Sequence, residues 1–345
     1  MRRKGLIMAK TEASDLQSGY WLYRFLPPKA AAYAQLARLD RPIGWQLLFW
    51  PCIWGLVLAF YAQNLFLLQS AFPVWPAADF LPVAIAHYHA FSPPGFLLFT
   101  ALLFLIGAVV MRGAGCTYND IVDHKIDAQV ARTKTRPLPS GRVSRGEALA
   151  FMLVQSLLGL LVLLQLPLKA VLLGLCSLFI VALYPFVKRI SHWPQAVLGL
   201  SFNWGALLGF AAIAQAVSWP SLLLYGGAVC WTIGYDTIYA HQDREDDALI
   251  GVHSTARLFG AQTRAALLVF YILAAAGLAG AFWLAGAGLW AFAGIAAAAA
   301  CLLWQIRRFD MNNAALCLKL FKSNNLVGLL VALPACIGLV CGRIC

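Results

Sequence analysis

Long apolar runs, separated by short polar and basic stretches, set the pattern of this 345-residue sequence. Nine of the runs have roughly 18–24 residues, the length that a helix needs to cross a hydrocarbon core ~30 Å thick. The runs lie at residues 42–62, 95–116, 147–165, 168–187, 194–215, 219–241, 264–284, 287–305 and 323–342. The pattern predicts an all-α polytopic membrane protein with about nine transmembrane helices around a central cavity.

Two stretches outside the runs have patterns of their own. Residues 29–40 place apolar side chains at helical spacing, which predicts an amphipathic helix at the membrane interface. Residues 63–94 form a long connection without Lys or Arg, and we expect a short interfacial helix near residues 80–87. The predicted organisation is an N-terminal extension over residues 1–37 followed by a single transmembrane domain over residues 38–345.

The composition excludes a soluble protein, because hydrophobic residues make up 61% of the chain and charged residues only 12%, where soluble domains are about a quarter charged. The nine cysteines form no CxxC pair, and the six histidines form no HxxxH or HExxH pattern. We therefore expect buried thiols rather than a disulfide framework or a zinc site.

The distribution of basic residues predicts the topology. Of the 26 Lys and Arg, 24 lie on one predicted side of the membrane, and only Lys169 and Arg343 lie on the other. The positive-inside rule then places the N-terminus in the cytoplasm or its equivalent. The net charge of +12 is explained by this orientation and by anionic lipid or diphosphate partners, so we expect no nucleic acid partner.

Acidic residues are concentrated in two stretches on that same side. Eight of the 14 Asp and Glu lie in residues 119–127 and 236–247. Read as helices, the stretches repeat polar side chains on one face, and carboxylates are natural ligands of Mg²⁺. The repeated positions are Asn119, Asp123 and Asp127 in the first stretch and Asp236, Asp243 and Asp247 in the second. Asp236 lies one turn inside its span, so it is protonated, paired with a cation or reached by water.

Basic residues follow both the first acidic stretch and the fourth span. Arg132, Lys134 and Arg136 alternate in a loop that ends in a Pro/Gly turn, and the YPFVKR sequence at residues 184–189 ends that span. Such residues suit a loop that closes over a Mg²⁺-bound diphosphate, although each group alone is equally typical of a basic cytoplasmic loop.

A charged head at the membrane surface and an apolar tail in lipid together point to a polyprenyl diphosphate. Its diphosphate would leave, and an electron-rich acceptor would attack the allylic cation that develops. The tryptophans are expected mostly at the lipid surface or interface, while a few of them line an apolar tunnel or stabilise the cation.

Several stretches of the sequence together resemble the UbiA superfamily of intramembrane aromatic prenyltransferases. They are RLDRPIGWQLLFWPCIW (38–54), MRGAGCTYNDIVDHKIDAQVARTKTRPLPSG (111–141), YPFVKRISHWPQAVLGLSFNWGALLGFAA (184–212), WTIGYDTIYAHQDREDDALIGVHSTARLFG (231–260) and FKSNNLVGL (321–329). The resemblance is strongest to members that act on 4-hydroxybenzoate. It implies transfer of a polyprenyl group to the ring carbon ortho to the hydroxyl of that acceptor, in ubiquinone biosynthesis.

The resemblance also implies roles for individual residues. Mg²⁺ would be held by Asn119, Asp123, Asp127, Asp243 and Asp247. Phosphate oxygens would meet Arg132, Arg136 and Lys188. Arg189 and Arg41 are the candidates for the benzoate carboxylate, and Tyr184 and Asp236 are the remaining predicted substrate-site residues. Two departures from the family pattern are Trp45 after the RPIG sequence and the long 63–94 connection.

Two alternatives stay open from the sequence. One is a UbiA-type enzyme with another acceptor, as in menaquinone, haem O or chlorophyll synthesis. The other is a secondary transporter, which also carries intramembrane carboxylates. We expect the bacterial inner membrane, because residues 1–37 lack an Arg/Ser-rich transit pattern; the alternative is the mitochondrial inner membrane.

Overall fold

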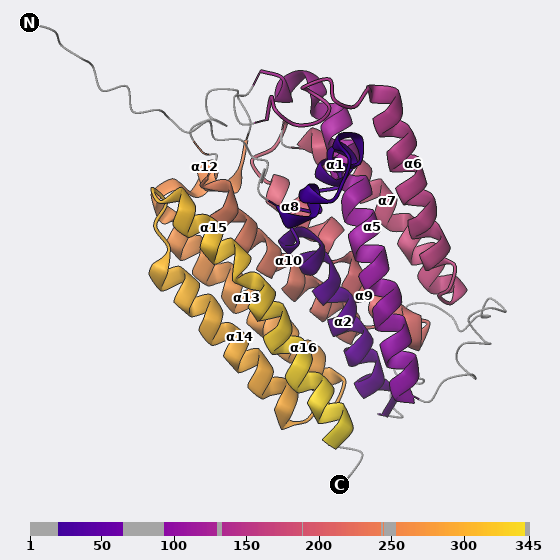
Figure 1. Ribbon diagram of the computed structural model, residues 1–345. Helices are drawn as coiled ribbons and strands as arrows, with labels where there is room; N and C mark the ends of the chain where they lie inside the picture. The colour runs from indigo at the N-terminus through magenta and orange to yellow at the C-terminus, as the bar shows by residue number, and fades with distance from the viewer. Residues whose placement is uncertain are drawn as a thin grey trace, which may run out of the picture. The chain divides into compact units, whose positions relative to one another are not determined.

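The computed structural model describes residues 20–64, 93–129, 133–187, 189–242, 244 and 253–341, and every regular element in these ranges is a helix (Figure 1). Within this part of the chain, eight segments are long and apolar enough to cross a membrane. They are Ile43–Gln63, Gly95–Lys125, Arg145–Leu163, Leu168–Val187, Pro194–Ala214, Thr255–Leu284, Leu289–Arg308 and Ala314–Cys341. The prediction of an all-α polytopic membrane protein is confirmed.

The remaining predicted span forms α10 (Trp219–Ala240), which is a continuous helix of 22 residues. It is not among the eight segments, because its serine, threonine, glycine and tyrosine residues and Asp236 lower its mean hydropathy. The predicted interfacial helix near residues 80–87 lies outside the described residues.

The chain divides into two compact units. Residues 1–42 and 110–158 form one, called here the smaller unit, and residues 43–109 and 159–345 form the other, the larger unit. Two helices, α5 (Pro93–Asp127) and α6 (Arg145–Leu163), contribute residues to both units.

In the smaller unit, η1 (Trp21–Arg24) precedes α1 (Pro28–Leu36). The helix predicted over residues 29–40 ends early, because Arg38 has a φ of 56°, in the left-handed region where a helix does not continue. Ala32 and Leu36 pack with Leu138, Val143 and Ala148 in a small core. These side chains of α1 are therefore covered by protein, and the position of the helix at the membrane interface stays a prediction.

The larger unit is built from long helices that contact one another in pairs. The helix α10 packs against α13 (Thr263–Leu284), α2 (Ile43–Asn64) against α9 (Trp204–Ala214), and α14 (Leu289–Arg308) against α16 (Asn324–Cys341). Figure 1 shows α13, α14 and α16 side by side. The other elements of this unit are α7 (Leu168–Val187), α8 (Pro194–Phe202), α12 (Thr255–Phe259), η2 (Gly260–Gln262) and α15 (Ala314–Lys322).

Glycines allow α2 and α9 to approach backbone to backbone. A Cβ atom at Gly55 would collide with the carbonyl oxygen of Ala206, and one at Gly209 would collide with that of Cys52. Small residues that let helices approach closely are the usual packing device within membranes, where the hydrophobic effect does not drive helices together.

The predicted span over residues 194–215 consists of two consecutive helices, α8 and α9, because the helix is interrupted at Asn203. The buried amide of Asn203 donates to the carbonyl oxygen of Gly199 at 2.8 Å and to Thr232 Oγ1 at 2.6 Å. These bonds satisfy polar groups at a break within an apolar environment.

Candidate functional site

The first acidic stretch forms the C-terminal end of α5, which runs from the apolar segment through Asp127 without a break. Asn119, Asp123 and Asp127 follow one another at intervals of four residues and therefore share one face of this helix. Asp123 is 1% exposed, and Asp127 is 8% exposed. The Oδ1 atom of Asn119 is buried and has no hydrogen-bond partner among the described residues.

Arg136 brings the basic loop onto this face. Its Nη1 atom donates to Asp127 Oδ2 at 2.8 Å and to Asp120 Oδ1 at 3.4 Å. The loop is held at its start by Thr133, whose Oγ1 donates to the carbonyl oxygen of Asp127 at 2.8 Å and whose carbonyl accepts from Arg136 N at 2.9 Å. The first acidic stretch and the basic loop are therefore in direct contact within the smaller unit.

Two residues of this cluster were not among the predicted site residues. Arg38 donates from Nη2 to both carboxylate oxygens of Asp120, at 2.8 and 2.9 Å, and from Nη1 to the carbonyl oxygen of Gln35 at 2.9 Å. Asp120 is seven residues before Asp127, a spacing that places them on the same side of a helix, and that spacing was the available sequence signal. Arg38 has no comparable signal, because it lies 82 residues from its partner.

Arg41, a candidate for the benzoate carboxylate, is half-buried in the smaller unit. Its Nε atom lies 4.0 Å from Oδ2 of the buried Asp40. Burial, followed by the negative charge of Asp40, raises the pKa of the nearby Tyr23 phenol well above its ordinary value.

The remaining predicted residues lie partly within and partly outside the described part of the chain. Tyr184 on α7 and Asp236 on α10 are half-buried in the larger unit, and both make interactions; whether Asp236 is protonated, paired with a cation or reached by water stays a prediction. Arg189 is exposed, with its guanidinium carbon 5.9 Å from the centroid of the Phe186 ring. Arg132, Lys188, Asp243 and Asp247 lie outside the described residues, so the convergence of the two acidic stretches stays a prediction.

The donors of the first stretch fit a divalent cation. Carboxylate and amide oxygens suit Mg²⁺, and the buried Oδ1 of Asn119 is a polar atom that needs a partner. Among the described residues, no three His, Cys, Asp or Glu side chains are placed so that they could hold a metal ion together. The predicted ligand set also contains an asparagine, Asn119, and two aspartates outside the described residues, Asp243 and Asp247.

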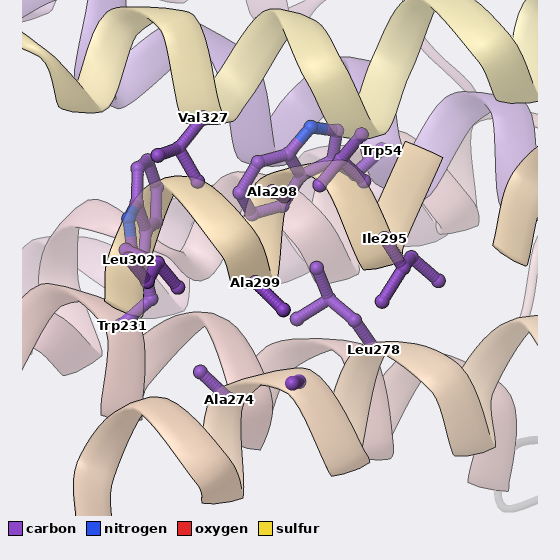
Figure 2. Close-up of a pocket in the computed structure, with 11 residues that line it drawn as sticks. Trp54, Trp231, Ala274, Leu278, Ile295, Ala298, Ala299, Leu302 and Val327 are labelled. Atoms are coloured by element: carbon purple, nitrogen blue, oxygen red, sulfur yellow. The ribbon is translucent and has the colours of Figure 1, made fainter. Parts of the chain in front are cut away.

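An apolar pocket lies within the larger unit, lined by residues from five helices. The lining residues are Trp54, Trp231, Ala274, Ala275, Leu278, Ile295, Ala298, Ala299, Leu302, Val327 and Val331. Figure 2 shows Trp54 and Trp231 among the residues that line the pocket. Both indoles are 1% exposed, so these two tryptophans are not at the lipid surface, and they agree with the expectation that a few of the tryptophans line an apolar space.

Hydrogen bonds to α16 hold the indole rings of this pocket. Trp231 Nε1 donates to Asn324 Oδ1 at 2.8 Å, and Trp54 Nε1 donates to the carbonyl oxygen of Gly328 at 3.0 Å. The two ring centroids are 4.9 Å apart, within the range of favourable aromatic pairs. The N–H groups of both indoles are therefore satisfied by α16 and leave the apolar parts of the rings at the pocket.

Comparison with known proteins identifies close relatives along most of the chain. The sequence model of the UbiA prenyltransferase family matches residues 70–327. The chain is 45% identical over 89% of its length to the mitochondrial 4-hydroxybenzoate polyprenyltransferase of Drosophila pseudoobscura pseudoobscura, of which it covers 70%. It is 40% identical to the protein of that name from Arabidopsis thaliana and 42% identical to that from Mus musculus, over 93% and 92% of this chain and 72% and 76% of the relatives.

Solved structures share the fold. A UbiA homologue from Aeropyrum pernix K1 matches with a TM-score of 0.60 and 26% identity, over 85% of this chain and 98% of that chain. A UbiA homologue from Archaeoglobus fulgidus, determined with GPP and Mg²⁺, matches with a TM-score of 0.55 and 18% identity, over 90% of this chain and 99% of that chain. With the family match over residues 70–327, these likenesses establish that the chain belongs to the UbiA prenyltransferase family.

Proposed function

We propose that this protein transfers a polyprenyl group from polyprenyl diphosphate to the ring carbon ortho to the hydroxyl of 4-hydroxybenzoate, in a Mg²⁺-dependent reaction of ubiquinone biosynthesis. The observation that carries the proposal is 40–45% identity, over about nine-tenths of the chain, to relatives named 4-hydroxybenzoate polyprenyltransferase. The bundle of apolar helices and the acidic face of α5 agree with chemistry on a charged head and an apolar tail.

The proposed metal ligands are Asn119, Asp123, Asp127, Asp243 and Asp247. When bound, Mg²⁺ neutralises the diphosphate and makes it a better leaving group. The Archaeoglobus fulgidus homologue holds GPP and Mg²⁺, which supports a divalent cation and a prenyl diphosphate for this chain.

The protein's own cations complete the diphosphate site in this proposal. Arg136 already lies at the acidic face through its bond to Asp127, and Arg132 and Lys188 are proposed to meet the same phosphate oxygens. Guanidinium groups suit this role because their fork of N–H donors matches phosphate geometry.

The proposed reaction makes one carbon–carbon bond. The bond between the allylic carbon and the diphosphate oxygen breaks, and diphosphate leaves with the electron pair. The ortho ring carbon bonds to the allylic carbon and then loses its proton. The surrounding helices exclude water, which would otherwise capture the allylic cation. Arg41 and Arg189 are the proposed partners of the benzoate carboxylate, and Tyr184 and Asp236 are proposed to border the acceptor.

The protein is a membrane protein, and the mitochondrial inner membrane is the compartment that we propose for it. The relatives are named mitochondrial, which supports the alternative of the mitochondrial inner membrane. The names of these relatives do not support the bacterial inner membrane. The division into an N-terminal extension and one transmembrane domain likewise stays a prediction.

The reaction is tested with membranes that contain the full chain, supplied with Mg²⁺, geranyl diphosphate and 4-hydroxybenzoate. The expected product is a benzoate whose mass increases by one geranyl group, absent when Asp123→Ala replaces the native chain. Parallel incubations with a dihydroxynaphthoate or with haem test the other acceptors of the family. Prenylation of one of these in place of 4-hydroxybenzoate would contradict the proposed acceptor, and Mg²⁺-independent uptake by sealed vesicles would favour a transporter.

A further inference from the structure

Asp120 differs from its acidic neighbours on α5 in the direction it faces. At about 100° of rotation per residue, Asp120 and Asp127 lie within about 20° of each other, whereas Asn119 lies about 80° from Asp127. Asp120 and Asp127 therefore form one edge of the acidic face, and Asn119 forms the other. The edge with Asp120 is the one that both arginines contact.

Arginines and carboxylates are paired at this edge. Arg38 and Asp120 form a two-bond pair whose side chains are only 8% and 1% exposed. Arg136 contacts Asp120 at 3.4 Å and Asp127 at 2.8 Å, so two guanidiniums meet two carboxylates. Arg38 bonds both carboxylate oxygens of Asp120, so a metal cation would have to displace this arginine in order to bind them. These contacts make Asp120 a poor metal ligand, although it lies inside the acidic stretch.

Arg38 is a fixed partner because its backbone is held in place. Arg38 N donates to the carbonyl oxygen of Gln35 at 3.0 Å, and the Arg38 carbonyl accepts from Arg41 N at 3.0 Å. The left-handed φ of 56° turns the chain at this residue. Since α1 packs through Leu36 against Leu138 of the basic loop, the segment that presents Arg38 and the loop that presents Arg136 belong to one packed body.

From these contacts, and resting on the proposed function, we infer that Asp120 and Arg38 form a positioning pair that holds Arg136 at the acidic face for binding of the diphosphate group. Asp120 connects the two arginines: it neutralises the buried Arg38 and gives Arg136 a second carboxylate beside Asp127. Asp120 and Arg38 thus act through Arg136, and neither touches the substrate or the metal.

The variant Asp120→Asn tests this inference in the purified full-length protein. We measure binding of inorganic diphosphate with Mg²⁺ by calorimetry, and the KM values for geranyl diphosphate and 4-hydroxybenzoate. Loss of a charged contact to Arg136 predicts diphosphate binding weaker by roughly 10- to 100-fold, with the KM for 4-hydroxybenzoate unchanged. In an Arg136→Ala background, Asp120→Asn should weaken diphosphate binding no further, because its effect passes through Arg136.

A double variant separates positioning from stability. Asp120→Asn alone leaves the Arg38 charge buried and destabilises the fold. Arg38→Gln combined with Asp120→Asn removes both charges and should restore the melting temperature close to that of the native chain, while diphosphate binding stays weak. Recovery of binding together with stability would overturn the inference, because it would mean that the pair only supports the fold.

Arg142→Ala is the matched control. Arg142 also ties the loop to α1, through a bond of 2.8 Å from Nη1 to Gln35 Oε1. Its Nη2 donates within the loop, to the carbonyl oxygen of Thr135 at 2.8 Å, and neither bond involves a carboxylate. Diphosphate binding should change by less than about twofold in this variant.

The remaining outcomes distinguish failure of the positioning role of Asp120 and Arg38 from failure of the proposed function. A loss of Mg²⁺ affinity in Asp120→Asn that persists without Arg136 would make Asp120 a metal ligand and overturn the inference. Native protein that binds diphosphate with Mg²⁺ but does not prenylate 4-hydroxybenzoate would refute the proposed acceptor alone. Native protein that does not bind diphosphate would refute both.

Discussion

The two units of the molecule keep their buried polar groups satisfied in different ways. In the smaller unit, charged side chains form ion pairs: Arg38 binds Asp120, and Arg136 binds Asp127. The pocket region of the larger unit uses neutral bonds, as between the Trp231 indole and Asn324. Charge-assisted bonds fix the arginines and carboxylates of the smaller unit, whereas neutral bonds turned away from the pocket leave an apolar wall in the larger unit. The comparison shows that the groups suited to a charged ligand lie in the smaller unit, while the polar groups around the pocket serve helix packing.

The largest expected effect is that of removing a carboxylate from the acidic face. Asp123→Ala should lower prenyl transfer by at least roughly 10²–10³-fold, because the proposed metal loses a ligand, while the protein still inserts into membranes. Product formation is measured by mass spectrometry. Asp310→Ala is the control, since this aspartate is exposed and its carboxylate accepts a local bond from Asn312 N. Retained activity in both Asp123→Ala and Asp243→Ala would remove the metal-bridging role.

A smaller effect is expected from the cation of the YPFVKR sequence. Lys188→Ala should raise the KM for geranyl diphosphate by roughly 10- to 100-fold, because a charged contact to phosphate is lost, and should leave the KM for 4-hydroxybenzoate nearly unchanged. Lys322→Ala, which removes an exposed lysine of α15, is the control. An equal rise in both KM values would place Lys188 elsewhere than at the diphosphate.

The neutral bonds of the larger unit should affect stability rather than substrate binding. Asn324→Ala leaves the buried Trp231 Nε1 without its acceptor, which should lower the free energy of unfolding by ~1–3 kcal/mol. Asn325→Ala is the matched control, because its bond to Trp50 is only part-buried, and a smaller loss is expected. Thermal unfolding in detergent measures both, and an equal loss in the two variants would contradict the role assigned to burial.

The smallest expected effect is a pH dependence in the smaller unit. Folding raises the pKa of Tyr23 above its ordinary value of 10.0, chiefly through burial. A raised pKa means that the folded state keeps the proton longer, so this contribution to stability is complete below pH 10 and decreases as the pH rises above it. Tyr23→Phe should flatten the loss of melting temperature between about pH 9.5 and 11. An unchanged slope would show that Tyr23 does not cause it.

The sequence predicted the spans well because length and apolar character are local properties. It was less accurate where a single residue changes the backbone, as with the left-handed Arg38 and the break at Asn203. The face shared by Asn119, Asp123 and Asp127 followed from helical periodicity. The pair between Arg38 and Asp120 did not, because its partners are 82 residues apart and only the fold brings them together.

The aromatic residues show the same limit. Trp54 and Trp231 carry the same local signal as tryptophans at the membrane interface, yet both are buried against a pocket. Their positions depend on acceptors from α16, namely Asn324 and the carbonyl of Gly328. Composition identifies such residues as apolar, but only the helix packing distinguishes an inner wall from a lipid-facing one.

The central claim is that carboxylates from the two acidic stretches bind the same metal–diphosphate group. An experimental structure of the full chain with Mg²⁺ and an unreactive geranyl thiodiphosphate tests it most directly. The account predicts carboxylate oxygens of Asp123 and Asp247 at about 2.1 Å from Mg²⁺ ions that bridge the same diphosphate. Carboxylates tens of ångströms apart, or on opposite sides of the membrane, would contradict it.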